Sequence, residues 1–253
     1  MPLTIEALGS MIKSTWKGEN SMNASTDSQA SGLKAEQNTE AEWESDNRTR
    51  AALYNLFAAA MARKIDETWL NPGFEATLRG GLPDSAGKDL VLKAIGSART
   101  DRKWFDEVQL DFDALFIVPG PKLIFPYESC YTHRNVDGTF GRLWQEPAQD
   151  MHRFLKEWEI EFAEGWDLIP DHIAVELSFM GNLCRLVSQR AGNEEEIQRI
   201  LGWQEQIFIN HLGPWVFELL GNMERKAETD FYRGLAKLLH AFLQEESEAL
   251  VKE

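Results

Sequence analysis

Apolar side chains recur every three or four residues along most of this sequence, which is the spacing that gives an α-helix one apolar face. Leu53, Leu56 and Phe57 begin such a pattern. Equivalent patterns predict helices at residues 104–116, 147–162, 170–191, 193–212 and 228–250. Gly192 is expected to stop the helix over 170–191, and Pro214 to interrupt or kink the helix over 193–212. Sustained two-residue alternation is absent, and residues 123–125, between prolines, are the one candidate strand. The sequence therefore predicts an all-α fold, with a single helical-bundle domain over residues 48–253.

Residues 1–47 are expected to form a flexible N-terminal tail that is largely disordered or loosely docked. Between residues 18 and 47, small and polar amino acids dominate, and large apolar side chains are nearly absent until Trp43. Such a segment buries too little apolar surface to offset the entropy lost on ordering. Residues 11–16 leave two alternatives open, a short docking helix and a frayed terminus.

The charge of the chain restricts its partners. Its 253 residues include 41 acidic and 26 basic side chains, which gives a net charge of −15. Nucleic acids and anionic membrane surfaces require clustered Lys and Arg, so neither is expected as a partner, whereas a basic peptide would be attracted. No apolar run approaches the roughly 20 residues of a membrane span. With no leader pattern and no Cys-x-x-Cys, we expect a cytoplasmic, reduced protein without stable membrane insertion.

Sequence patterns for catalysis or for a cofactor are weak. Five residues separate Gly81 from Gly87-Lys88, and Asp89 stands where a phosphate loop has Ser or Thr, so this segment is interpreted as a turn between helices. No two of the five histidines share a metal-binding spacing on one helix face. Ser129 and Cys130 lie in no nucleophile motif. We therefore expect no catalysis, no metal and no cofactor.

Asp171 and His172 are adjacent, so on a helix their side chains would point about 100° apart and would not form a catalytic pair. Asp171 is interpreted as a carboxylate in the first turn of a helix, and His172 as a capping or buried polar residue. The acidic run over residues 157–167 is either a solvated face or a landing site for a basic peptide. The connection over residues 118–146 is long and rich in Pro, Gly and aromatics, and such connections are often functional.

Several motifs occur in a recognisable order. Residues 112–116 consist of an aromatic residue, two others and Leu-Phe. Residues 126–131 read Pro-Tyr-Glu-Ser-Cys-Tyr. A helix then opens with Pro-Asp-His at 170–172 and continues to Glu176-Leu177. His-Leu-Gly-Pro-Trp follows at 211–215, and the segment 231–236 contributes a further match. Over roughly residues 48–246, the chain resembles the TorD/DmsD/NarJ-type redox-enzyme maturation chaperones.

The resemblance implies a binding function without catalysis or a bound cofactor. Relatives hold the N-terminal signal peptide, often twin-arginine, of a molybdenum-cofactor oxidoreductase, and they keep the apoenzyme in the cytoplasm until the cofactor is inserted. Phe112 and Phe116 would line an apolar groove, and Asp167 is the nearest acid available to pair with a peptide arginine. The peptide-binding residues implied in this way are Phe112, Phe116, Pro126, Glu128, Ser129, Tyr131, Asp167, Asp171, His172 and Glu176.

Within this implied site, Glu128, Ser129 and Tyr131 would shape the rim of the groove, while Asp171 and His172 would contact the polar part of the peptide. Two other functions stay open, an assembly factor that binds a folded reductase subunit and a metal-dependent helical hydrolase. The sequence does not name the client enzyme. It is also compatible with either a monomer or a domain-swapped homodimer. Guanine-nucleotide binding is associated with the family, but the segment from Gly81 to Lys88 gives it no support.

Overall fold

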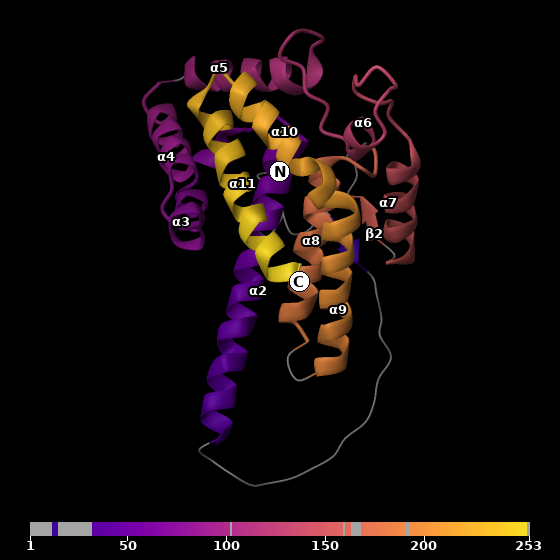
Figure 1. Ribbon diagram of the computed structural model, residues 1–253. Helices are drawn as coiled ribbons and strands as arrows, with labels where there is room; N and C mark the ends of the chain where they lie inside the picture. Colours follow the sequence, from indigo (N-terminus) through magenta and orange to yellow (C-terminus); the bar gives the residue numbers. More distant parts are fainter. Residues whose placement is uncertain are drawn as a thin grey trace.

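The computed structural model describes residues 12–14, 32–101, 103–158, 160–162, 168–190 and 193–251. The described chain is almost entirely helical, which confirms the predicted all-α fold (Figure 1). Its strands are short: β1 (Ile12–Ser14) pairs antiparallel with β2 (Ile160–Phe162), and Lys13 lies opposite Glu161 in the register.

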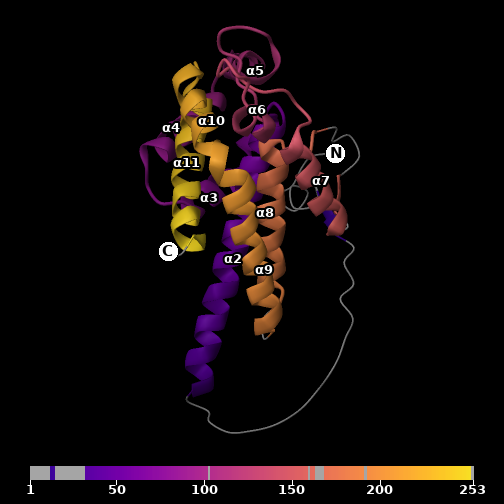
Figure 2. The ribbon, with the colours of Figure 1, turned by 45° about the vertical axis from the view of Figure 1, so that its right-hand side comes forward.

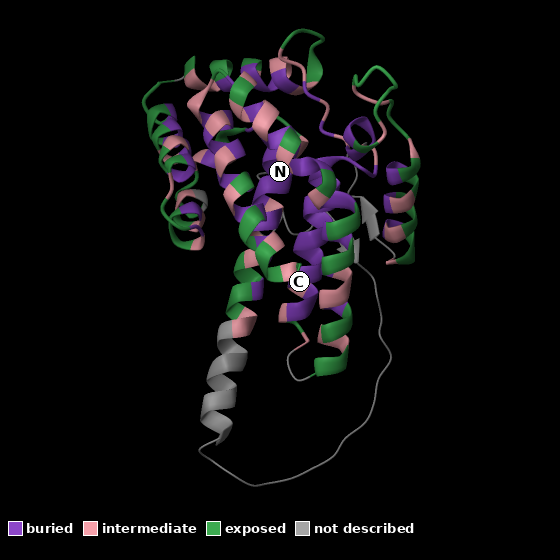
Figure 3. Cartoon of the chain, viewed as in Figure 1, coloured by how far each residue is buried: buried purple, intermediate pink, exposed green. Residues whose placement is uncertain are grey.

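The centre of the bundle is formed by α2 (Gly32–Ala62) and α8 (Ile173–Ser188), which pack along each other. Nearly every side chain of α8 is buried (Figure 3), as expected for a helix that is apolar on all sides. Helix α9 (Glu194–Ile207) covers α8, and α10 (Gly213–Lys226) packs against α11 (Asp230–Leu250). Figure 2 shows the same arrangement from a second side.

A smaller group of elements covers α11 on the opposite side from α9: η1 (Glu67–Leu70), α3 (Pro72–Gly81), α4 (Ala86–Ala98) and α5 (Lys103–Phe112). The Lys88 ammonium is buried and donates hydrogen bonds to the carbonyl oxygens of Arg79 (2.8 Å) and Leu82 (2.7 Å). This confirms that the Gly81–Lys88 segment is a turn between two helices.

The long connection follows a π-helical turn, η2 (Asp113–Ile117), and contains the short helix α6 (Glu128–Thr132) before α7 (Glu146–Glu157). Residues 123–125 form no strand: the Leu123 N–H donates to the Gly120 carbonyl in a turn (3.2 Å), the Ile124 N–H donates to the Leu115 carbonyl (2.7 Å), and neither belongs to a ladder between strands. Gly141 fixes the second half of the connection, since a Cβ there would lie 2.0 Å from the His133 carbonyl oxygen. The connection is thus held by specific close contacts.

The predicted helix over 193–212 continues through the proline. Helix α9 passes into a π-helical turn, η3 (Phe208–Leu212), and then directly into α10. Pro214 has no N–H to donate and its ring crowds the preceding turn, so a locally widened turn accommodates it. Gly213 permits this turn, because a Cβ there would lie 2.8 Å from the Phe208 carbonyl oxygen.

Three expected boundaries differ from the structure. Helix α2 begins at Gly32, within the expected tail, because residues 33–42 are rich in good helix formers. Phe162, expected on the helix over 147–162, lies in β2, since that helix ends at Glu157 and the chain then pairs with β1. Within the expected docking segment 11–16, Ile12–Ser14 is a strand. Residues 1–11 and 15–31 and the predicted helix stop Gly192 lie outside the described residues, so the division of the chain at residue 47 stays a prediction.

Candidate functional site

The structure brings together most of the predicted polar site residues. Helix α6 of the connection, the start of α8 and the turn η3 meet in a buried cluster that we call the polar junction. Its members are Glu128, Ser129, Asp171, His172, Glu176 and His211, and all are buried. Residues far apart in the sequence thus form one hydrogen-bonded group.

Asp171 fastens the connection to α8. Its Oδ2 accepts hydrogen bonds from the Ser129 backbone N–H (2.9 Å) and from the Ser129 hydroxyl. Its carbonyl oxygen accepts from the Glu128 N–H (3.0 Å), and the Pro126 carbonyl accepts from the Ile173 N–H (2.9 Å). The Asp171 carboxylate therefore accepts hydrogen bonds from Ser129 donors that are buried away from water, and it fixes the position of α6.

His172 is the N-cap of α8, which confirms its interpretation as a capping residue. Its Nδ1 accepts a hydrogen bond from the Ala174 N–H (3.0 Å), so the neutral ring carries its proton on Nε2. Burial lowers the pKa of His172 to about 3. The Tyr127 ring packs edge-on against the imidazole at 5.0 Å between ring centroids. The residue thus acts as an uncharged cap.

Two carboxyl groups share the interior of the junction. Burial raises the pKa of Glu176 well above its usual value, and the neighbouring Glu128 and Asp171 carboxyls raise it further. Burial also raises the pKa of Glu128, an effect partly offset by a hydrogen bond from His211, whose Nδ1 lies 3.0 Å from Oε2 of Glu128. The Trp215 indole N–H donates to Glu176 at 3.2 Å. Burial and the neighbouring carboxyls therefore both shift the pKa of Glu176 towards the protonated form.

The burial of these residues differs from what the sequence led us to expect. Glu128, Ser129 and Tyr131 were expected at the rim of a groove, but their side chains are buried because α6 packs against α7 and α10. Tyr131 packs against Trp215 with ring centroids 5.3 Å apart. Direct contact of these residues with a peptide stays a prediction.

The two phenylalanines of the predicted groove lie in another part of the molecule. Phe112 is buried, and Phe116 packs against its ring at 5.1 Å between centroids. Both also face Tyr232 near the start of α11. Leu115 lies in the core, as expected. Asp167 lies outside the described residues.

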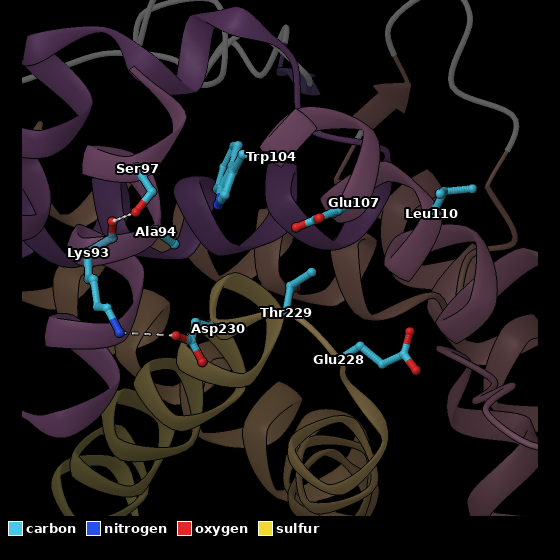
Figure 4. Close-up of a pocket in the computed structure, with 9 residues that line it drawn as sticks. All are labelled: Lys93, Ala94, Ser97, Trp104, Glu107, Leu110, Glu228, Thr229 and Asp230. Atoms are coloured by element: carbon cyan, nitrogen blue, oxygen red, sulfur yellow. Dashed lines mark hydrogen bonds and ion pairs between the residues drawn. The ribbon is translucent and has the colours of Figure 1, made fainter. Parts of the chain in front are cut away.

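One surface cleft, here named the α5 cleft, has a volume of about 550 Å³ and lies where α4, α5 and the start of α11 meet (Figure 4). Trp104 and the exposed Leu110 give it apolar walls. Two of its three acids have basic partners, because Asp230 pairs with Lys93 (3.6 Å) and Glu228 pairs with Lys122, whereas Glu107 is exposed and has no ion-pair partner among the described residues. Neither Phe116 nor His172 lines it.

A second cleft, the α7 cleft, has a volume of about 390 Å³ and lies between α7 and η3. Its walls are Asp150, Arg153, Phe154, Glu157, Asn210 and His211. His211 also belongs to the polar junction, so this cleft adjoins the predicted site from outside. Glu157 is exposed and has no ion-pair partner among the described residues, whereas Asp150 pairs with Arg153. An aromatic wall beside an unpaired carboxylate suits a guanidinium group.

The sequence interpretation recognised His211 as part of a motif but assigned it no role, and it missed the residues of α7. A signal was present, because Asp150, Phe154 and Glu157 are spaced four and three apart and so share one helix face. Among the described residues, no group of three or more His, Cys, Asp or Glu side chains is arranged to hold a metal ion. In the same part of the chain, no helix is long and apolar enough to span a membrane.

Comparisons with known proteins identify the family. The chain is 26% identical to the chaperone protein TorD of Vibrio parahaemolyticus, over 82% of this chain and 97% of that protein. It is 29% identical to the chaperone protein TorD of Photobacterium profundum, over 82% and 96% of the two chains. The model of the nitrate reductase delta subunit family matches residues 82–221, which is more than half of the sequence. The protein is therefore a member of the nitrate reductase delta subunit family.

Proposed function

We propose that this protein is a cytoplasmic, system-specific chaperone without catalytic activity, which assists the maturation of a molybdenum-cofactor oxidoreductase. The likeness to proteins named chaperone TorD over most of the chain supports this proposal. We further propose that it binds the N-terminal signal peptide of that client, before cofactor insertion and export. The α7 cleft is the observation that supports binding of the peptide. Its wall contains the unpaired carboxylate of Glu157 and the aromatic ring of Phe154, and through His211 it adjoins the polar junction.

Its contact with the polar junction and the acidic sequence that follows it favour the α7 cleft over the α5 cleft as the site for arginine. In the α5 cleft, Asp230 and Glu228 have basic partners at Lys93 and Lys122, and the third acid, Glu107, lies away from the polar junction. In the α7 cleft Glu157 keeps its charge unpaired within the described structure, and the sequence after Lys156 continues with acidic residues and no basic one as far as Asp167. A guanidinium entering there would form charge-assisted hydrogen bonds, which are about twice as strong as neutral ones.

The polar junction has a supporting role in this proposal. Asp171 and Ser129 hold the connection, and the hydrogen bond from His211 to Glu128 fixes one wall of the α7 cleft. A chaperone needs this wall to be preorganised, since ordering it on binding would reduce the affinity. In this proposal, the residues of the polar junction affect peptide binding indirectly, because they hold the wall of the α7 cleft in place.

Titration calorimetry on the full-length protein tests the proposal. The probe is a synthetic peptide with two adjacent arginines followed by an apolar segment, and the matched peptide has both arginines replaced by glutamine. We expect the glutamine peptide and the Glu157→Gln variant each to lower affinity about tenfold, and Glu248→Gln, an exposed acid on α11, to leave it unchanged. Equal affinity for both peptides would reject arginine recognition.

A second arm of this experiment separates the proposal from the alternative in which a folded subunit is bound. Here the probe is a client precursor compared with the same protein lacking its N-terminal leader. Retention of the precursor alone supports recognition of a signal peptide. Equal retention of both forms would favour an assembly factor that binds the folded subunit.

A further inference from the structure

Trp144 is an exposed tryptophan in an unusual backbone conformation. It is 57% exposed, and Leu143 beside it is 42% exposed. Its φ angle of 61° places it in the left-handed region, and it is the one non-glycine residue with positive φ in the described parts of the chain. A bulky side chain is strained in this region, and strained residues persist where the surroundings hold them. We call Leu143 and Trp144 the apolar tip.

The polar junction holds the apolar tip in place. The Gln145 side-chain amide donates to the carbonyl oxygens of Ser129 (3.2 Å), His133 (3.2 Å) and Arg142 (2.9 Å). The Gly141 N–H donates to the Cys130 carbonyl (2.9 Å). The tip is thus bracketed by hydrogen bonds to α6, so its side chains are presented to solvent from a fixed base.

The apolar tip continues into the face of α7 that bears the α7 cleft. Helix α7 begins at Glu146, directly after Gln145. Glu146, Asp150, Arg153 and Glu157 follow at intervals of four, three and four residues, so they lie along one side of the helix. The apolar tip is therefore followed, along α7, by a surface that is mainly acidic.

We propose that Leu143 and Trp144 bind the apolar segment that follows the arginines of the peptide held in the α7 cleft. This inference rests on the proposed function and adds the second half of the site and the direction of the peptide. The arginines lie beside Glu157 and Phe154, and the chain runs antiparallel to α7 towards the tip. Charge complementarity at the cleft and the continuity of the helix face support this occupant.

The length of α7 sets the spacing that a bound peptide must have. From Trp144 to the cleft residues Phe154 and Glu157 is about 15–20 Å along the helix, at about 1.5 Å per residue. An extended peptide advances about 3.3 Å per residue, so about five to six residues separate the arginine from the first apolar anchor. A peptide with the reverse order of the two segments would not fit this direction.

The test uses the full-length protein and two peptides of identical composition. In one, two arginines precede a leucine-rich segment by about five residues, the spacing set by α7; in the other, the leucine-rich segment comes first. The Trp144→Asn variant removes the ring and keeps a residue that tolerates positive φ, and Val136→Ser removes another exposed apolar side chain of the same connection. Because Asn relieves the strain, this variant should unfold at the same or a higher temperature than the unmodified protein.

We expect Trp144→Asn to lower the affinity for the arginine-first peptide about tenfold. A version of this peptide in which serines replace the leucines should bind Trp144→Asn and the unmodified protein equally. Val136→Ser should bind the arginine-first peptide as the unmodified protein does. The reversed peptide should bind at least tenfold more weakly than the arginine-first peptide. If Trp144→Asn binds the arginine-first peptide as the unmodified protein does, the inference fails while arginine recognition stands. If the glutamine peptide binds as well as the arginine peptide, the proposed function itself fails.

Discussion

His211 Nδ1 lies 3.0 Å from Oε2 of Glu128, and this contact joins the wall of the α7 cleft to the buried polar junction. The two residues are 83 positions apart in the sequence, and both are at least 95% buried. The contact links the connection before α7 to the π-helical turn that precedes α10. A change in one residue should therefore affect both segments.

Replacing His211 by alanine is expected to destabilise the protein by about 1–3 kcal/mol, because the Glu128 carboxyl loses its buried partner. Urea unfolding followed by circular dichroism measures this loss. His240→Ala is the matched control, because His240 is exposed on α11, where it packs against the Phe217 ring, so its loss should be within about 0.5 kcal/mol. Similar losses for the two variants would contradict a structural role for the Glu128–His211 pair.

The raised pKa of Glu176 makes stability depend on pH in a defined direction. Between the ordinary glutamate pKa and the higher folded value, the folded state binds more protons than the unfolded state, so stability falls as pH rises through this window. One such proton contributes a slope of at most about 1.4 kcal/mol per pH unit. In Glu176→Gln the side chain is always neutral, so this contribution should disappear.

The measurement for this prediction is the free energy of unfolding of both proteins between pH 4 and pH 8. We expect the stability of Glu176→Gln, relative to the unmodified protein, to rise steadily above about pH 4.5, the usual pKa of a glutamate. Val136→Ser, an exposed substitution that changes no titratable group, should give a difference that stays constant over this pH range. A constant difference for Glu176→Gln would show that Glu176 is ionised in the folded protein.

The sequence predicted the helical fold and which residues assemble, but it did not predict their exposure. Apolar spacing was sufficient for the second half of α2 and for α8, because a helix that buries a face must repeat it every turn. Asp171 and Ser129 were grouped through motif order, and they do meet. Their burial depends on the packing of α6 against the start of α8, a contact between residues 42 positions apart that no local pattern encodes.

Two features of the candidate site also lay beyond local patterns. The left-handed conformation of Trp144 follows from the hydrogen bonds of Gln145 to carbonyls on α6, so it depends on tertiary structure. The π-helical turn at Phe208–Leu212 arises because Pro214 disrupts a helix that packing on both sides preserves. Pro214 indicated a break or kink of the helix. That the helix continues is determined by its packing against neighbouring helices.

Gly141→Ala is expected to disturb the connection, since the added Cβ would meet the His133 carbonyl oxygen at 2.0 Å, too close for any carbon. The backbone must shift, and we expect a loss of about 1–3 kcal/mol. Gly96→Ala is the matched control: nothing lies within 4 Å of a Cβ there, and alanine in α4 should stabilise the protein by about 0.5–1 kcal/mol. Thermal unfolding should therefore shift in opposite directions for the two variants.

The pair formed by Arg50 and Glu246 should be the strongest single polar contribution between α2 and α11. The guanidinium donates to both carboxylate oxygens, at 2.7 and 2.6 Å, and also to the Gln204 side chain, while the Tyr54 hydroxyl donates to Glu246 at 2.9 Å.

Glu246→Ala leaves a largely buried cation and a buried hydroxyl without this acceptor, so we expect a loss of about 3–5 kcal/mol. Arg79→Ala, which removes an exposed pair with Glu75, should lose at most about 1 kcal/mol. Because the bidentate pair bridges α2 and α11, hydrogen exchange in Glu246→Ala should accelerate in these two helices together. Acceleration confined to α11 would mean that apolar packing alone holds α2 in place.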